Sequence, residues 1–334
     1  MLRWIAAALF ANATSAIAQA PLPIIDMHMH ASRADSNGPP PAFICAPFSQ
    51  FPAWDPARSP RRNFTDLAKG CAKPLASPTT DQAVQDQTIA VMRSHNIFGM
   101  LGGSLERVST WQAAAPGRFF PALGLDLRTS KASTEEIRSL AARGKIVALF
   151  EIAAQYYGIS PQSPELEPIF AVAEQLDLPV GIHIGSGPPG TPYLGQGMRA
   201  AHSDPLLLEP VLLAHPRLRL WIAHGAFNQP ERLKTLMHAH PQVYADMGAV
   251  SFVMPEKAFH GWVCDLVEHG FGNRLMFGSD QMVWPQAIGI AIDRVERAPC
   301  LTAEAKRDIF YNNAARFLRF DEATIAHHHR PAPR

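Results

Sequence analysis

The stretch IIDMHMH, residues 24–30, is an apolar run of strand length that ends in two histidines. Side chains alternate across a strand, so His28 and His30 project from the same side of it. Two imidazoles side by side at a strand end suit a divalent cation such as zinc. Two histidines on one strand face can equally be structural, so the weight of this stretch depends on what surrounds it.

Seven more apolar runs of strand length follow along the chain, with helical patterns between them. The predicted strands span residues 24–30, 97–102, 119–125, 146–152, 179–184, 218–223, 243–247 and 275–278. The predicted helices span residues 80–95, 105–115, 134–143, 165–176, 204–215, 230–240, 256–269, 285–297 and 303–320.

This alternation predicts an α/β fold, a single-domain (β/α)8 TIM barrel over residues 21–322. Its strands are mostly continuous apolar runs, which is typical of a parallel sheet covered by helices on both faces. An open doubly wound sheet is the alternative, but no GxGxxG turn follows the first strand. Long loops, residues 31–78 and 185–203, follow strands one and five at the end of the barrel where active sites lie.

The composition is that of a globular protein. The chain has 334 residues, 47% of them apolar, with 30 Lys and Arg against 29 Asp and Glu. A net charge of +1 argues against nucleic acid as the main partner, because phosphate binding needs a concentrated basic surface. A small-molecule substrate is therefore the expected partner, and no feature of the sequence indicates an oligomeric state.

Residues 1–20 have the pattern of a secretory signal peptide. Arg3 precedes an apolar stretch that is too short to span a bilayer, and small-residue sites then favour cleavage after Ala18 or Ala20. The alternative is an N-terminal helix of the fold. The signal predicts an exported, periplasmic protein with no membrane span in the mature chain. At the other end, residues 323–334 are predicted to be a disordered tail.

Export changes how the four cysteines are interpreted. Cys45 and Cys71 flank a stretch without clear periodicity, and in an oxidising compartment they are predicted to form a disulfide, with two unpaired thiols as the alternative. Cys264 and Cys300 lie in or beside predicted helices and are expected to be buried and unpaired. None has the CxxC spacing of a zinc or redox site.

Polar residues end three further apolar runs. His183 ends the fifth predicted strand, His224 follows the sixth and Asp280 follows the eighth. Each one alone is as well explained as a core histidine or a helix-capping aspartate. Because the carboxyl ends of parallel barrel strands meet at one rim, their coincidence with His28 and His30 predicts a metal site there.

These residues and their spacing resemble the amidohydrolase superfamily of metal-dependent barrels. The local sequences are most similar to the amidohydrolase-related branch that includes aminocarboxymuconate semialdehyde decarboxylase, over residues 24–320. The motifs that carry the resemblance are IIDMHMH, GIHIG, IAHGA and MFGSD. The resemblance implies metal ligation by His28, His30, His183 and Asp280. It also implies that His224 is either a ligand of a second metal or a catalytic acid/base and polarising group.

Glu151 ends the fourth predicted strand, where binuclear members of the superfamily often carry a bridging carboxylate. It suggests a two-metal centre, with His28, His30 and Asp280 on one ion, His183 and His224 on the other, and Glu151 between them. A shared anion offsets the repulsion between two cations that lie about 3.5–4 Å apart. The alternative is that Glu151 only orients a ligand histidine.

The expected function is that of a metal-dependent hydrolase acting on an ester, lactone or amide, with one or two ions. Zn²⁺ is the first expectation, although manganese, iron and cobalt take similar ligands. Asp280 would move the proton of the attacking water, and His224 or the metal would polarise the carbonyl. With one metal, the same frame could support non-oxidative decarboxylation of a small unsaturated or aromatic acid. A non-catalytic periplasmic metal- or ligand-binding barrel is the third possibility.

The sequence indicates substrate-contacting residues less clearly than metal ligands. Arg128 follows strand three and Arg199 lies in the loop after strand five, and either could pair with a carboxylate or be a solvated surface arginine. Other polar and aromatic residues near the predicted rim could line a pocket or serve packing, namely Asp126, His202, Asp246, Trp284, Tyr156, Tyr157 and Tyr193. The substrate itself is left undefined. No GxSxG elbow or phosphate-binding loop is present.

Overall fold

The computed structural model describes residues 21–65, 67–125, 127 and 133–330. The predicted signal peptide, residues 1–20, and the end of the predicted tail, residues 331–334, lie outside the described residues. Within the described part of the chain, no helix is long and apolar enough to cross a membrane.

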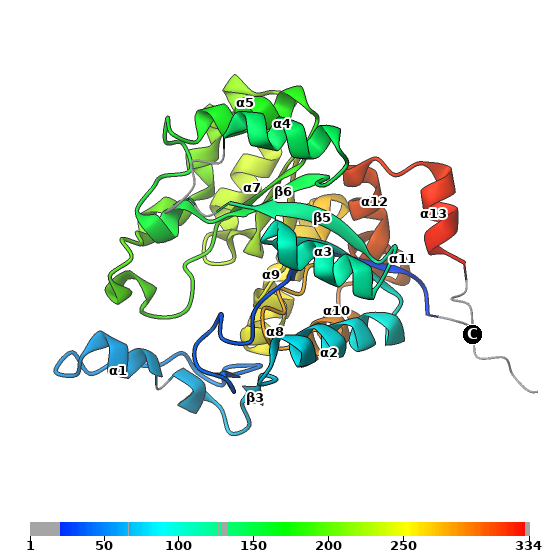
Figure 1. Ribbon diagram of the computed structural model, residues 1–334. Coiled ribbons are helices and arrows are strands. Elements are labelled where there is room, and N and C mark those ends of the chain that lie inside the picture. Colours follow the sequence, from blue (N-terminus) through cyan, green and yellow to red (C-terminus); the bar gives the residue numbers. More distant parts are fainter. Residues whose placement is uncertain (1–20, 66, 126, 128–132, 331–334) are drawn as a thin grey trace, which may run out of the picture.

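Eight parallel strands form one nearly closed barrel with helices between them, which confirms the predicted (β/α)8 fold (Figure 1). In sheet order the strands are β1 (Ile24–His30), β4 (Ile97–Gly103), β5 (Phe119–Gly124), β6 (Ala148–Ile152), β7 (Val180–His183), β8 (Leu220–Ala223), β9 (Val243–Asp246) and β10 (Leu275–Met276). Two main-chain hydrogen bonds join the ends of this sheet. Met27 N–H donates to Phe277 O over 2.9 Å, and Asp280 N–H donates to His28 O over 2.7 Å.

Helices cover the outside of the barrel. They are α2 (Asp81–Ser94), α3 (Leu105–Ala114), α4 (Thr134–Ala142), α5 (Glu167–Gln175), α6 (Glu209–Ala214), α7 (Pro230–Ala239), α9 (Glu256–Glu268) and α10 (Gln286–Arg297). Local sequence explains several starts, because the side chains of Thr80, Ser104 and Ser133 accept hydrogen bonds from main-chain N–H groups of the first turn. The shells of buried aliphatic residues on both sides of each strand match the continuous apolar runs of the sequence.

The predicted last helix is broken into three pieces, α11 (Ala303–Arg307), a π-helical turn (Asp308–Asn312) and α12 (Asn313–Leu318). Tyr311, Ala314 and Phe317 from these pieces pack against side chains inside the barrel, such as Met27 and Trp221. This packing closes the end of the barrel that lies opposite the carboxyl ends of the strands. The candidate site lies at the other end of the barrel.

The prediction of a disordered tail is wrong for most of its length. Residues Glu322–His328 form helix α13, which begins where the Asp321 carboxylate accepts a hydrogen bond from Thr324 N–H over 2.8 Å. His328 is 3% exposed and stacks on Phe98, with ring centroids 3.9 Å apart. The burial of an aromatic ring and the helix cap offset the conformational entropy that this segment loses when it becomes ordered. The composition of the segment did not indicate either contact.

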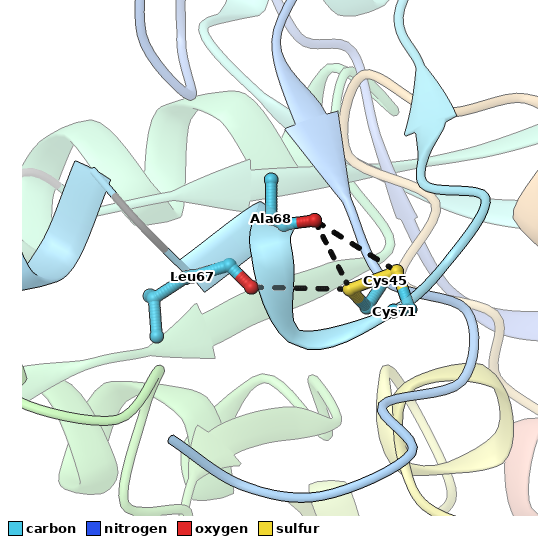
Figure 2. The surroundings of a disulfide bond; sticks show 4 residues. All are labelled: Cys45, Leu67, Ala68 and Cys71. Atoms are coloured by element: carbon cyan, nitrogen blue, oxygen red, sulfur yellow. Dashed lines mark hydrogen bonds between the residues drawn. A yellow bond between two sulfur atoms is a disulfide. The ribbon is translucent and has the colours of Figure 1, made fainter. Parts of the chain in front are cut away.

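The loop over residues 31–78 has structure of its own. It contains the antiparallel pair β2 (Phe43–Ile44) and β3 (Leu75–Ala76), a short helix α1 (Pro60–Thr65) and a 3-10 turn (Leu67–Gly70). Cys45 and Cys71 form the expected disulfide, with the carbonyl oxygens of Leu67 and Ala68 3.8 and 3.6 Å from the Cys45 sulfur (Figure 2). The disulfide joins the two ends of the segment that carries α1.

The expectation of unpaired thiols at Cys264 and Cys300 is wrong. These residues form a second disulfide, between α9 and the segment that follows α10, with Cα atoms 5.6 Å apart. Their sequence separation of 36 residues, on different elements, gave no sign of the pairing. The packing of α9 against α10 places the two Cα atoms within the range that a disulfide requires.

Candidate metal centre

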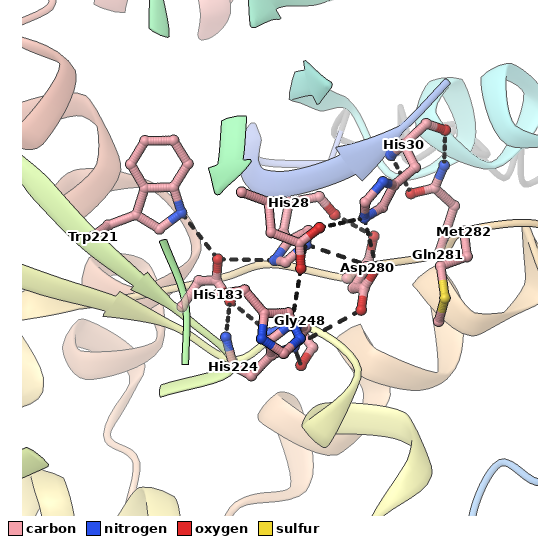
Figure 3. Close-up of polar contacts among 12 residues, drawn as sticks. His28, His30, His183, Trp221, His224, Gly248, Asp280, Gln281 and Met282 are labelled. Atoms are coloured by element: carbon pink, nitrogen blue, oxygen red, sulfur yellow. Dashed lines mark hydrogen bonds and ion pairs between the residues drawn. The ribbon is translucent and has the colours of Figure 1, made fainter. Parts of the chain in front are cut away.

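Six polar residues from five strand ends converge at the carboxyl end of the barrel. They are the six predicted metal-site residues, His28, His30, Glu151, His183, His224 and Asp280. Figure 3 labels all of them except Glu151. His28 and His30 end β1, Glu151 lies in β6, His183 ends β7, and His224 and Asp280 follow β8 and β10. The barrel thus brings together residues that are up to 252 positions apart (from 28 to 280).

The six side chains form three overlapping groups that could each hold a cation. Within each group, one ligand atom per residue lies within 4.8 Å of the others. The groups are His28 with His30 and Glu151, His28 with His224 and Asp280, and Glu151 with His183 and His224. Because Glu151 belongs to the first and the third group, its carboxylate lies between the two histidines of β1 and the histidines of β7 and β8.

The two carboxylate oxygens of Glu151 face different histidines. Oε2 lies 3.3 Å from Nε2 of His30, whereas Oε1 lies 2.9 Å from Nε2 of His224 and 3.4 Å from Nε2 of His28. Asp280 lies across from it, with Oδ1 2.9 Å from Nε2 of His30 and 3.7 Å from Nε2 of His28. These distances suit shared cations between the nitrogens and the carboxylates.

Hydrogen bonds at Nδ1 orient two of the histidine rings. Nδ1 of His28 lies 3.1 Å from Oδ2 of Asp246, and Nδ1 of His224 lies 2.9 Å from the carbonyl oxygen of Gly248. A carboxylate and a carbonyl can only accept, so Nδ1 carries the proton in both rings. When the Nε2 proton is lost, the Nε2 lone pair of each ring points into the site, as a metal-ligating histidine requires.

Asp246 organises the floor of the site, a role that its place at a predicted strand end did not reveal. Its carboxylate is fully buried and accepts from Nδ1 of His28, from Nε1 of Trp221 over 3.1 Å, and from the main-chain N–H groups of His224 and Gly248 over 3.0 and 2.8 Å. Burial raises the pKa of Asp246, but the charge and hydrogen bond of His28 outweigh it and lower the pKa below its usual value. Asp246 is therefore ionised.

Two glutamines that sequence reasoning missed also hold site residues. Gln155 Nε2 donates to the carbonyl oxygen of His183 over 2.7 Å and contacts Nδ1 of the same residue. Gln281 brackets His30, because it accepts from His30 N–H over 3.1 Å and donates to His30 O over 2.7 Å. Neither glutamine belongs to a periodic pattern or a motif, so the sequence carries no signal for them.

Charge in the site favours a cation. Burial lowers the pKa of His28, but the carboxylates of Asp246, Glu151 and Asp280 outweigh this and raise it well above its usual value. For Glu151, burial raises the pKa, but the charges of His28 and His30 and a hydrogen bond from His224 lower it well below its usual range. Burial lowers the pKa of His183 to about 3, so this ring is neutral and one of its two nitrogens has a lone pair for a metal.

The donor set fits a divalent metal. Nε2 of His28 and Nε2 of His30 are buried and form no hydrogen bond with any residue that the structure describes. Buried polar atoms are rarely left in this state, and coordination would satisfy both. Imidazoles with carboxylates are the donors expected for zinc and for neighbouring first-row metals. His30, with 23% of its side chain exposed, lies on the side of the site that is open to solvent.

The weaker candidates from the sequence, those for substrate contact, have different positions in the structure. Arg128 and Asp126 lie outside the described residues, and Arg199 is exposed at the start of a 3-10 turn. Trp284 is buried in the wall and donates from Nε1 to the carbonyl oxygen of Ala42 over 3.0 Å, a packing role. Tyr193 is 70% exposed.

The barrel and the cluster of histidines and carboxylates at its rim define a metal-dependent class of barrel enzymes. Residues 25–320 match the model of the family described as Amidohydrolase, and the chain belongs to this family. No protein of the curated set is significantly similar to the chain in sequence.

Several solved structures share the fold. An uncharacterised TIM-barrel protein from Bordetella bronchiseptica has a TM-score of 0.63 at 17% identity, over 91% of this chain and 100% of its own. The 5-carboxyvanillate decarboxylase of Sphingomonas paucimobilis has a TM-score of 0.57 at 16% identity, over 90% and 100%. A probable 2-pyrone-4,6-dicarboxylic acid hydrolase of Acinetobacter baumannii has a TM-score of 0.56 at 16% identity, over 89% and 99%.

Proposed function

We propose that this protein is a metal-dependent hydrolase that cleaves an ester, lactone or amide bond in a small organic molecule. The observation that carries the proposal is the position of Glu151, whose two oxygens face His30 and His224 at 3.3 and 2.9 Å. A carboxylate between two sets of histidines suits a two-metal hydrolytic centre, because a shared anion offsets the repulsion between the two cations.

In this proposal the six residues divide between two ions. His28, His30 and Asp280 would hold one ion, His183 and His224 the other, and Glu151 would contact both. Zn²⁺ is the first candidate because the donors are imidazoles and carboxylates. Divalent cations held there would supply Lewis acidity and lower the pKa of water toward neutrality.

The residues of the chain account for the proton transfers. Asp280 is 4% exposed and lies beside His30 at the side of the centre that is open to solvent. It would accept the proton of the attacking water and deliver it to the leaving group. Asp246 and Gly248 would keep His28 and His224 in the orientation that leaves Nε2 unprotonated.

A decarboxylase on the same barrel is the second candidate, and one feature of the site favours it. His28, His30 and Asp280 lie together without a contribution from Glu151, because Oδ1 of Asp280 is 2.9 Å from Nε2 of His30 and 3.7 Å from Nε2 of His28. A single ion there would leave His224 free to act as an acid or base beside a substrate carboxylate. Decarboxylation is the activity named for the fold neighbour from Sphingomonas paucimobilis.

We also propose that the protein is exported. All four cysteines are paired in disulfides, Cys45 with Cys71 and Cys264 with Cys300. Disulfides persist in oxidising compartments such as the bacterial periplasm and are rare in the cytosol. This pairing supports the interpretation of residues 1–20 as a signal peptide.

The proposal is tested by assaying the metal-loaded protein against panels of esters, lactones and amides, with carbon dioxide release measured from aromatic and unsaturated acids. Hydrolysis that disappears after chelation and returns with the metal is expected. Asp280→Asn should lower that turnover by about 10²- to 10⁴-fold, whereas Asp293→Asn, with 69% of the side chain exposed, should leave it unchanged. Carbon dioxide release without hydrolysis would overturn the hydrolase in favour of the decarboxylase. No turnover in either assay would favour a binding protein.

A further inference from the structure

Tyr156 lies beside the candidate metal centre but belongs to none of its ligand groups. It is in a 3-10 turn, η2 (Ala154–Tyr157), directly after the strand that carries Glu151. Its ring meets the His183 ring edge-on, with centroids 4.9 Å apart and an interplanar angle of 64°. The side chain is half-buried.

The hydroxyl of Tyr156 borders the loop that follows β7. A Cβ built on Gly187 would lie only 2.7 Å from the hydroxyl oxygen, and Gly187 has a φ of +65°. The loop approaches the tyrosine this closely because residue 187 has no side chain. Within the described part of the chain, the hydroxyl forms no hydrogen bond, so its proton is available to a bound molecule.

The surroundings keep this hydroxyl protonated. Burial raises the pKa of Tyr156, and the negative charges of Glu151 and Asp280 raise it further. The edge-on contact with the His183 ring places the Tyr156 ring beside one of the candidate ligands. A neutral phenol at this place can donate a hydrogen bond to an anionic or partly charged oxygen.

We infer that Tyr156 is a substrate-binding residue, whose hydroxyl donates a hydrogen bond to a carboxylate or carbonyl oxygen of the substrate held at the metal centre. The inference rests on the proposed function, because it takes the centre to bind an oxygen-bearing substrate. The competing explanation is that Tyr156 serves only to pack its ring against His183. A phenylalanine would fill that packing role equally well, so Tyr156→Phe separates the two explanations.

The test measures the binding of small oxyanions to the cobalt-loaded full chain. Visible absorption of cobalt reports the binding of acetate or phosphate, and no substrate has to be known. Tyr156→Phe should weaken binding by about 10- to 100-fold, because a hydrogen bond to a charged acceptor is lost. Tyr193→Phe, the same chemical change at a 70% exposed site, should stay within about twofold of the wild type. Gly187→Ala, which crowds the hydroxyl, should weaken binding in the same direction.

Equal affinity in the wild type and in Tyr156→Phe would overturn the inference, as would a wild type that binds neither anion. Cobalt content and the spectrum without added anion should be the same in both proteins, because Tyr156 is no ligand in this account. A wild type that takes up no metal would instead contradict the proposed function. The failure of the inference and the failure of the proposed function are therefore separate results.

Discussion

Three residues of the candidate centre, Glu151, His224 and Asp280, have left-handed backbone conformations with φ of 34°, 63° and 53°. Such a conformation costs on the order of 1–3 kcal/mol per residue outside glycine. Hydrogen bonds donated by main-chain N–H groups hold two of them, from His224 N–H to Oδ1 of Asp246 over 3.0 Å and from Asp280 N–H to the carbonyl oxygen of His28 over 2.7 Å. The strain turns side chains from three separate strand ends toward one point, which is expected where their position serves chemistry.

Asp246→Asn tests whether this support acts on the metal. In Asp246, Oδ2 accepts from His28 and Trp221, and Oδ1 accepts from the main-chain N–H groups of His224 and Gly248. The amide keeps the size of the side chain but has only one acceptor oxygen, so one of these two pairs of hydrogen bonds is lost. We expect metal affinity to fall by about 10- to 100-fold, measured by competition with a chelator. Asp293→Asn is the exposed control. Unchanged affinity in a folded Asp246→Asn protein would contradict the orienting role.

The six candidate ligands were predictable because each one ends an apolar run, where a polar residue stands out. Gln155 and Gln281 were not predictable, since a lone glutamine in a loop belongs to no pattern and its partner depends on the fold. The pairing of Cys264 with Cys300 escaped for the same reason. Sequence pattern reports which face of an element is buried, and contacts between distant elements appear only when the barrel is closed.

At the scale of elements, the strands were predictable and their ends less so. Continuous apolar runs marked all eight, but β10 (Leu275–Met276) is two residues shorter than predicted and β6 begins at Ala148 instead of residue 146. Val147 is 41% exposed, so this position precedes the buried part of the strand although its side chain is apolar. Helix α13 shows the opposite case, because its histidine-rich sequence looks solvated whereas His328 is buried against Phe98.

The burial of His328 predicts a pH dependence of stability. Burial and the neighbouring charges of His327, His329 and Arg118 lower its pKa to about 4, against about 6.5 in the unfolded chain. Its contribution to the free energy of unfolding is therefore fully present above pH 6.5. It is lost as pH falls from 6.5 to 4, by at most roughly 1.4 kcal/mol per pH unit, because the unfolded state takes up the proton first.

Urea unfolding of the wild type and of His328→Phe, between pH 7.5 and 4.5, measures this effect. The wild type should lose stability more steeply below pH 6.5 than His328→Phe, in which no proton can bind at this position. His238→Gln, a change at an exposed histidine of α7, should follow the wild type. Equal pH slopes in the wild type and in His328→Phe would show that α13 does not keep His328 neutral.

At the scale of the whole molecule, one end of the barrel is sealed and the other carries the site. The C-terminal helices fill the end of the barrel where the strands begin, and the loop over residues 31–78 lies beyond the carboxyl ends of the strands (Figure 1). Trp54 of this loop packs on Gly190 of the loop after β7, where an added Cβ would lie 1.6 Å from the indole. Because the Cys45–Cys71 disulfide anchors the first loop, we expect these two loops to shape the substrate pocket together.

The central claim is that Glu151 bridges two cations, and metal content tests it most directly. The full chain is loaded with zinc, freed of excess metal by gel filtration, and analysed for zinc and protein. We predict two zinc ions per chain in the wild type and in the exposed control Glu165→Ala, and no more than one in Glu151→Ala. One ion per chain in the wild type, or two in Glu151→Ala, would contradict the account.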